Sequence, residues 1–206
     1  MKAIEQREGW FWPADDQGCW NTQSSNPNLP DKLASHCRQH RTAFQAGGNC
    51  GVYIKRFAEL FDAVYTCEPD ITNFVCLTLN TRDKDNVYRY QCGIGKDHEG
   101  IALDTFNNDA GAVHVSGRGN IPVILIDDLN LQNVDLVAID IEGFEYNALL
   151  GAKETLAKWK PTLVIEWYQP WADRYGFTLE ATEEYLKQFG YKYVAGYESD
   201  RVYQVE

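Results

Sequence analysis

The sequence lacks the features that mark a membrane or exported protein. None of its apolar runs approaches the roughly 20 residues that a membrane-spanning helix needs. The first ten residues have no apolar core of the kind found in signal peptides. These two absences predict a cytoplasmic protein that does not insert into a membrane.

Closely spaced cysteine pairs are also missing. The six cysteines include no Cys-x-x-Cys pair, the spacing of many zinc and redox sites. Several of them fall within segments that we expect to be strands or helices. This pattern favours reduced, mostly buried cysteines over a disulfide framework or a zinc site.

Positive charge is scarce. Lysine and arginine number 19 against 30 acidic residues, so the net charge is −11. Nucleic acids and anionic membranes are bound chiefly through basic surfaces, so neither is an expected partner. A small or neutral substrate fits better, and the residues carry no signal for an oligomeric state.

No Gly-x-x-x-x-Gly-Lys-Ser/Thr phosphate loop is present, which disfavours an NTPase. The most informative stretch instead begins with a short apolar strand, Thr42–Ala46, followed by a turn that holds three glycines. A helix from Val52 is indicated by apolar residues at helical spacing. A second strand, Ala63–Cys67, then ends on the acid Glu68.

Nucleoside cofactors bind to this order of strand, glycine turn, helix, strand and acid. Glu68 stands 21 positions after Gly47, close to the spacing of about 20 expected for an acid that accepts both ribose hydroxyls. The alternative is a tight turn with a solvated Glu68. The turn departs from Gly-x-Gly-x-x-Gly, the pattern that seats a pyrophosphate. An NAD-linked oxidoreductase therefore stays an alternative that this spacing disfavours.

Two further apolar strands end on acids: Val134–Ile139 precedes Asp140, and 161–165 precedes Glu166. Alternating strands and helices predict an α/β fold with a mostly parallel sheet and helices on both faces. Segments 191–195 and 202–205 should close it as an antiparallel hairpin. Ligands bind such sheets beyond the carboxyl ends of the strands, so Glu68, Asp140 and Glu166 should face one crevice.

Other boundaries follow from the same patterns. We expect a third strand at 87–92 and one helix at 146–156. Residues 1–41, rich in aromatic side chains, form an N-terminal extension before the main domain, 42–206. The extension either covers a sheet edge or acts as a lid over the pocket, and a polar loop spans 21–30.

Five segments of the sequence resemble the FkbM-type methyltransferases: Gln45-Ala-Gly-Gly-Asn-Cys-Gly, Glu68-Pro-Asp-Ile-Thr-Asn-Phe, Ile126-Asp-Asp-Leu, Ile139-Asp-Ile-Glu-Gly-Phe-Glu and Lys160-Pro-Thr-Leu-Val-Ile-Glu. The resemblance runs from about Ala43 to Glu166. It implies a Rossmann-like class I methyltransferase fold and S-adenosyl-L-methionine as cofactor. It also implies O-methylation of a hydroxyl on a small molecule or glycan. A catalytically inactive binding module with the same fold is the other alternative.

The resemblance implies that the cofactor lies against the glycine turn, against Glu68 and the two residues that follow it, and against the ends of the third and fourth strands. These residues are Gln45, Ala46, Gly47, Gly48, Asn49, Gly51, Glu68, Pro69, Asp70, Cys92, Gly93 and Asp140. Two positions depart from the family pattern. Gln45 stands where the family commonly has Asp, and Ala138 where it commonly has Lys.

Methyl transfer requires that the protein align the nucleophile, exclude water and accept a proton from a hydroxyl. The candidate catalytic acids are Asp140, Glu142 and Glu166, of which Asp140 is preferred because it directly ends a strand. Glu142 could instead cap the following helix, as we expect for Glu145. Although the three acids could together bind Mg²⁺, we expect transfer without a metal ion.

Overall fold

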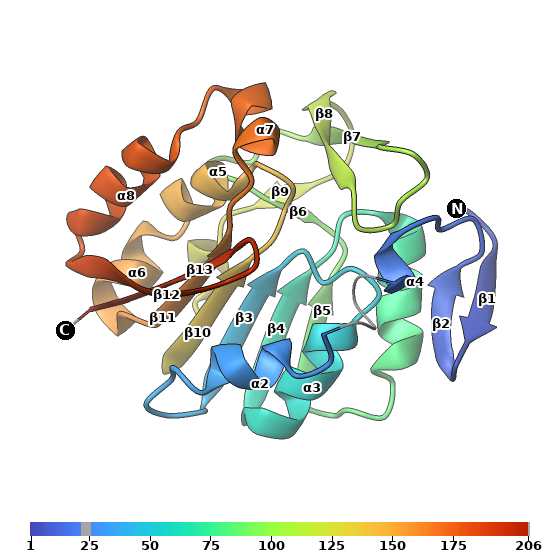
Figure 1. Cartoon of the computed structure of the whole chain (residues 1–206), viewed down its shortest axis with the longest axis horizontal. Helices are drawn as coiled ribbons and strands as arrows, with labels where there is room; N and C mark the ends of the chain where they lie inside the picture. Colours follow the sequence, from blue (N-terminus) through green and yellow to red (C-terminus); the bar gives the residue numbers. More distant parts are fainter. Residues whose placement is uncertain (22–25, 206) are drawn as a thin grey trace.

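A seven-stranded sheet forms the centre of the computed structural model, which describes residues 1–21 and 26–205 (Figure 1). Its strands, in spatial order, are β12 (Tyr191–Tyr197), β13 (Asp200–Val205), β11 (Thr162–Glu166), β10 (Val134–Ile139), β3 (Thr42–Ala46), β4 (Ala63–Cys67) and β5 (Val87–Tyr90). β10, β11, β3, β4 and β5 pair in parallel, while β13 is antiparallel to both of its neighbours. The predicted α/β fold with a C-terminal hairpin is confirmed.

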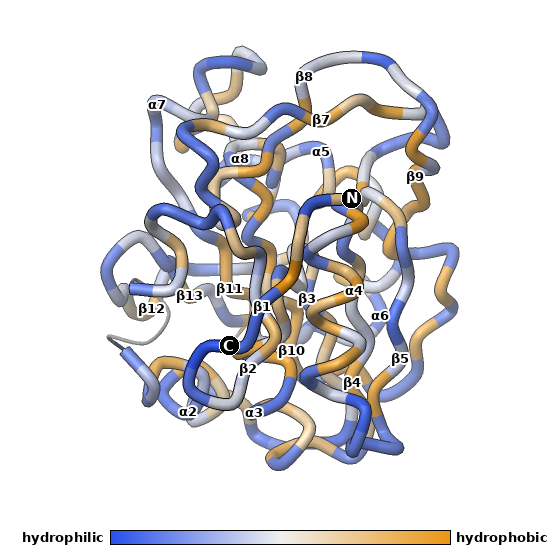
Figure 2. Tube along the Cα trace, turned by 90° about the vertical axis from the view of Figure 1, so that its right-hand side faces the viewer, coloured by the Kyte–Doolittle hydropathy of each residue, from blue (hydrophilic) through white to orange (hydrophobic). Residues whose placement is uncertain are grey.

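Helices cover both faces because side chains alternate along each strand. On β10, Leu136 and Ala138 pack into a core cluster with residues of α2 (Leu29–Ala34), α3 (Val52–Leu60) and α4 (Ile71–Asn80). Val137 and Ile139 pack on the other face with α5 (Glu145–Leu150), α6 (Lys153–Trp159) and α8 (Leu179–Lys187). Figure 2 shows the hydrophobic stretches of the chain around these central strands. A strand that is buried on both faces has a continuous apolar sequence, which is why β10 could be predicted from the sequence.

The helix expected over 146–156 is two helices, so that prediction was wrong in its extent. α5 and α6 are separated at Gly151, where an added Cβ would lie 2.1 Å from the Gly95 carbonyl oxygen. The Asp127 carboxylate caps α6, accepting from Glu154 N at 2.8 Å and from Thr155 N at 2.9 Å. Asp127 belongs to the short 3₁₀ helix η1 (Asp127–Leu129), and its cap fixes a new helix start.

The strand expected over 87–92 is shorter than predicted. β5 ends at Tyr90, the partner of Cys67 at the end of β4, and the separate strand β6 (Gly93–Ile94) pairs with β9 (Val123–Ile124) outside the main sheet. Between them in the sequence, β7 (Ile101–Thr105) and β8 (Val113–Arg118) form an antiparallel hairpin. This excursion and the turn formed by α7 (Gln169–Ala172) and η2 (Asp173–Tyr175) stand above the carboxyl ends of the strands (Figure 1).

The N-terminal segment begins with a hairpin of β1 (Ile4–Arg7) and β2 (Trp10–Pro13). It packs on α4, where the Asn80 side chain accepts from Phe11 N at 2.7 Å and donates to Phe11 O at 2.9 Å. The hairpin therefore covers a helix rather than an edge strand. The polar loop expected over 21–30 lies partly outside the described residues. Among the described helices, none has the length and apolarity required to cross a membrane.

Candidate active site

A cavity of about 320 Å³ opens at the carboxyl ends of β3, β4, β10 and β11. It lies where the strand order reverses between β3 and β10, the usual ligand position in such sheets. Its walls include the glycine turn, the loop between β7 and β8, and the turn between β12 and β13.

The glycine turn is held against β4 and β10. The amides of Gly47 and Gly48 both donate to the Cys67 carbonyl oxygen, at 3.0 and 3.1 Å. Gly47 has φ +83°, and a Cβ there would lie 1.8 Å from the Asp140 carbonyl oxygen. Only glycine fits this position, and it lets the backbone after β3 approach the end of β10.

Glu68 is 4% exposed and its carboxylate bridges the turn and α4. One oxygen accepts from Asn49 N at 2.8 Å and the other from Asp70 N at 2.9 Å. Burial raises the pKa of Glu68 to about 7, despite these two backbone bonds that lower it. Each oxygen keeps a lone pair, so the carboxylate can still accept two hydroxyl donors from a ligand in the cavity.

Gln45 also lines the cavity and is 5% exposed. Its Nε2 donates to the Gly47 carbonyl oxygen at 3.2 Å, whereas its Oε1 has no hydrogen-bond partner among the described residues. A buried acceptor left unpaired costs about 1–3 kcal/mol, so a ligand that donates to it gains affinity. Gln45 Oε1 therefore suits a donor such as the ammonium group of a cofactor.

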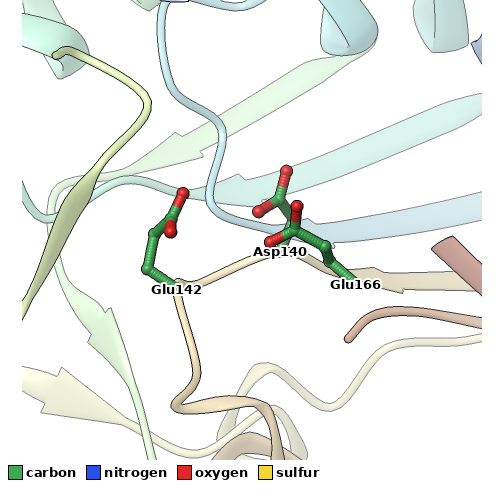
Figure 3. Close-up of side chains that lie close together, drawn as sticks. All are labelled: Asp140, Glu142 and Glu166. Atoms are coloured by element: carbon green, nitrogen blue, oxygen red, sulfur yellow. The ribbon is translucent and has the colours of Figure 1, made fainter. Parts of the chain in front are cut away.

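Asp140, Glu142 and Glu166 converge in the same cavity, where the Asp140 backbone lies against Gly47 of the glycine turn. One carboxylate oxygen of each lies within 4.8 Å of the other two, and Figure 3 shows their side chains rising on the same side of the ribbon. Asp140 N donates to the Ala46 carbonyl oxygen at 3.1 Å, which fixes Asp140 to the end of β3. Ser199 donates its hydroxyl to Glu166 at 3.1 Å.

Two acids of this cluster, Asp140 and Glu142, have raised pKa values. Burial, with Glu166 and Glu142 nearby, raises the pKa of Asp140 well above its usual range. Burial and Glu166 raise the pKa of Glu142 to about 9, and the same two causes raise that of Asp200 to about 7. Neighbouring carboxylates in a poorly solvated site cannot all ionise unless a cation joins them. The cluster is thus built to receive positive charge.

Glu142 and Glu145 have different positions. Glu145 is buried, and one of its oxygens accepts from Ile141 N at 3.1 Å and Gly143 N at 3.0 Å. It therefore stabilises the turn ahead of α5. Glu142 occupies that turn with φ +58° and faces the cavity, an uncommon conformation for a side-chain-bearing residue that is found often at functional sites.

Most residues predicted for the site line the cavity: Gln45, Gly47, Gly48, Asn49, Glu68, Pro69, Cys92, Gly93, Asp140, Glu142 and Glu166. Three do not. Ala46 is buried in β3, Gly51 lets α3 and α4 pack closely with its φ of +90°, and Asp70 caps α4 by accepting from Thr72 N and Asn73 N. Their contribution to a bound cofactor would be through the backbone or through packing.

The sequence-based prediction missed several residues that line the cavity. Asp200 lies on β13, where it pairs with Glu166 on β11. Asn73 comes from α4, Trp171 from α7, and Ala110 from the loop after β7. Only the antiparallel pairing of β13 brings Asp200 to this place, and no local pattern could have indicated it.

The strand order and the cavity at its reversal are those of the Rossmann-like methyltransferase class. The chain belongs to the FkbM methyltransferase family, because the family model described as "Methyltransferase FkbM domain" matches residues 49–193. No curated protein matches the sequence.

Solved structures show the same fold at low identity. An FkbM methyltransferase from Methylobacillus flagellatus KT aligns with a TM-score of 0.53 and 22% identity, over 80% of this chain and 43% of that one. The chain thus spans less than half the length of that relative. The N-methyltransferase NodS from Bradyrhizobium japonicum aligns with a TM-score of 0.53 and 10% identity, over 90% and 98%. A SAM-dependent methyltransferase from Aquifex aeolicus aligns with a TM-score of 0.53 and 14% identity, over 88% and 92%.

Proposed function

We propose that the chain is an S-adenosyl-L-methionine-dependent methyltransferase that methylates a hydroxyl oxygen of a small molecule or glycan. The observation that carries this proposal is the pairing of two sites in one cavity. Glu68, which accepts from Asn49 of the glycine turn, and the three clustered carboxyl groups all line this cavity. The family and the fold agree with it.

The residues present fit this cofactor. Glu68 is placed to accept the ribose hydroxyls, and Gln45 Oε1 to accept from the amino group. The carboxyl cluster around Asp140 complements a cationic sulfonium. When bound, the cofactor supplies a methyl group already activated for displacement.

Asp140 is our preferred base for the acceptor hydroxyl. Its backbone is fixed between β10 and the Ala46 carbonyl, so its carboxylate has a set position. Burial and the neighbouring acids raise its pKa, so its carboxylate is a stronger base than an exposed one once the cationic cofactor favours the ionised form. Glu142 and Glu166 are near enough to hold the acceptor or to share the proton.

We also propose that the reaction needs no divalent ion. The three carboxyl groups have a geometry that hard cations accept, so the proposal is open to direct test. Activity should persist in excess chelator. Activity that is lost with chelator and restored by Mg²⁺ would mean that the carboxyl cluster is a metal site.

A labelled-methyl assay tests the proposed reaction. The protein is incubated with S-adenosyl-L-methionine labelled in the methyl group and a panel of sugars, lipids, polyketides and peptides. We expect transfer to a hydroxyl-bearing acceptor, seen as a mass gain of one methyl, and no transfer with Glu68→Ala at limiting cofactor. Cofactor binding without any transfer would support the inactive-module alternative, and transfer to nitrogen would overturn the assignment to oxygen.

A further inference from the structure

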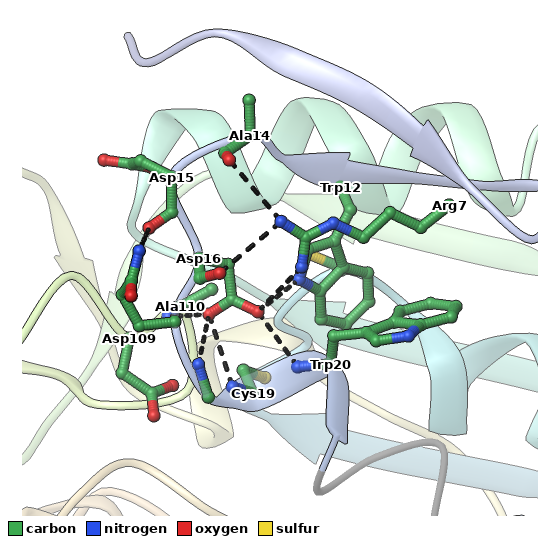
Figure 4. A network of polar contacts seen from close by, with 12 residues as sticks. Arg7, Trp12, Ala14, Asp15, Asp16, Cys19, Trp20, Asp109 and Ala110 are labelled. Carbon is green, nitrogen blue, oxygen red and sulfur yellow. Dashed lines mark hydrogen bonds and ion pairs between the residues drawn. The ribbon is translucent and has the colours of Figure 1, made fainter.

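Asp16, in the N-terminal segment, lies inside a network of polar contacts that joins this segment to Ala110 (Figure 4). Its side chain is fully buried. Its Oδ2 accepts from the Trp12 indole at 2.8 Å and from Trp20 N at 2.9 Å, and its Oδ1 accepts from Cys19 N at 3.3 Å. These bonds fold the segment after β2 around one carboxylate.

One further contact of this carboxylate leaves the N-terminal segment. Oδ1 also accepts from Ala110 N at 2.9 Å, in the loop between β7 and β8. Ala110 is buried, and it lies 94 positions away in the sequence. The Asp16 carboxylate therefore joins the N-terminal segment to the loop that forms one wall of the cavity.

The Ala110 carbonyl oxygen continues the connection. It accepts from Asn73 Nδ2 at 2.9 Å and from Asn49 Nδ2 at 3.2 Å. Asn49 belongs to the glycine turn, and its backbone amide donates to Glu68 at 2.8 Å. A continuous chain of hydrogen bonds thus runs from Asp16 through Ala110 and Asn49 to the acid placed at the ribose.

Close packing reinforces the contact between the two segments. A Cβ on Gly18 would lie 2.2 Å from an Asp109 carboxylate oxygen, and one on Gly111 would lie 3.2 Å from Cys19 Sγ. Cys19, Asp109, Ala110 and Gly111 all line the cavity. The N-terminal segment is therefore part of the cavity wall.

We propose that Asp16 is a positioning residue for cofactor binding, acting through Ala110 to hold Asn49 and the glycine turn in place. This inference rests on the proposed function, because the ligand is the proposed cofactor. Asp16 touches neither the reacting atoms nor the cofactor, so its loss should weaken cofactor binding more than it slows transfer at saturating cofactor.

The test is calorimetric titration of S-adenosylhomocysteine into the wild type, Asp16→Asn and a control. Asp135→Asn is a matched control. Asp16 accepts from the backbone amide of Ala110 and forms an ion pair with Arg7 at 3.6 Å. Asp135 likewise accepts from a backbone amide, Arg41 N at 2.8 Å, and forms an ion pair with an arginine, but it lies at the start of β10, at the opposite end of the strand from the cavity. We expect at least about a tenfold loss of affinity in Asp16→Asn, with little change in Asp135→Asn. Equal losses, or no loss in folded Asp16→Asn, would overturn the proposal.

A double-mutant cycle separates positioning from general damage. Asp16→Asn and Asn73→Ala both loosen Ala110, so their combined effect on affinity should be smaller than the product of their separate effects. Fully multiplicative effects would mean that the two residues act independently. Failure of the wild type to bind would instead contradict the proposed function and not this inference alone.

Hydrogen exchange of the wild-type protein tests the same coupling without any variant, and so applies even if Asp16→Asn does not fold. Binding of S-adenosylhomocysteine should slow exchange of the Ala110, Cys19 and Trp20 amides together. Protection of the 106–112 loop without any change at Cys19 and Trp20 would show that the N-terminal segment is not coupled to the site.

Discussion

Glu68 is the residue that we propose as the acceptor of the cofactor's ribose hydroxyls. It is buried, and each of its oxygens already accepts one backbone amide. Removing it would leave those amides and the ribose hydroxyls without an acceptor in a closed site. We expect Glu68→Ala to weaken binding of S-adenosylhomocysteine by about 2–3 kcal/mol. Titration into folded wild type and variant measures this, and unchanged affinity would remove Glu68 from the ribose site.

The Asp140→Asn variant distinguishes two roles for Asp140, as the base in methyl transfer or as a residue that holds the cofactor. Asp140→Asn keeps the shape of the side chain and removes its capacity to take a proton. If Asp140 is the base, single-turnover transfer at saturating cofactor should fall about 10²–10⁴-fold while affinity changes little. If it only holds the cofactor, affinity falls and the rate survives. Wild-type rate and affinity together would exclude Asp140 from the site.

At the scale of elements, the break between α5 and α6 depends on a distant cap. Asp127 accepts from two amides and the Thr155 hydroxyl at the start of α6. Asp127→Ala should lower the free energy of unfolding by about 0.5–2 kcal/mol, and Asp127→Asn by much less, because asparagine also caps helices. Chemical denaturation measures both. A loss as large in Asp127→Asn as in Asp127→Ala would argue against capping as the cause.

The sequence predicted those elements whose signal is local. β3, β4 and β10 are apolar runs closed by a glycine turn or an acid, and their predicted bounds match the structure. The helix over 146–156 failed because Asp127, which caps the start of α6, is far away in the sequence. The strand over 87–92 was predicted two residues too long, because its pairing with β4 ends at Tyr90.

The same limit applies to the candidate site. Glu68, Asp140 and Glu166 were predicted to meet because the carboxyl ends of parallel strands share one edge of the sheet. The positions of Asp16, Ala110 and Asp200 depend on tertiary contacts that no spacing in the sequence reveals.

For the whole molecule, the acids with raised pKa values determine the expected dependence of stability on pH. In the folded state the pKa of Glu68, Glu145 and Asp200 is about 7 and that of Glu142 about 9, all above their usual values. The folded protein therefore holds more protons than the unfolded chain from about pH 5 to pH 9, so its stability should fall as pH rises through this range. Thermal unfolding without ligand, measured across this range, tests the sign. A rising transition temperature would contradict it.

Binding of the cofactor should partly offset this loss of stability at higher pH. The sulfonium of S-adenosyl-L-methionine favours ionised carboxyl groups, so binding should release protons and should strengthen as pH rises through the range where Asp140 and Glu142 titrate. S-adenosylhomocysteine has no sulfonium and should show a weaker dependence. Calorimetry in buffers of different ionisation enthalpy counts the released protons. Equal release by both ligands would place the sulfonium away from the cluster.

The most direct test of the account is calorimetric titration of the wild-type protein with S-adenosylhomocysteine and, separately, with NAD. The account predicts saturable binding of S-adenosylhomocysteine at one site per chain and no binding of NAD, because the glycine turn lacks the spacing that seats a pyrophosphate. Binding of NAD without binding of S-adenosylhomocysteine would contradict the account and favour an oxidoreductase. Binding of neither would contradict a nucleoside-cofactor site in this cavity.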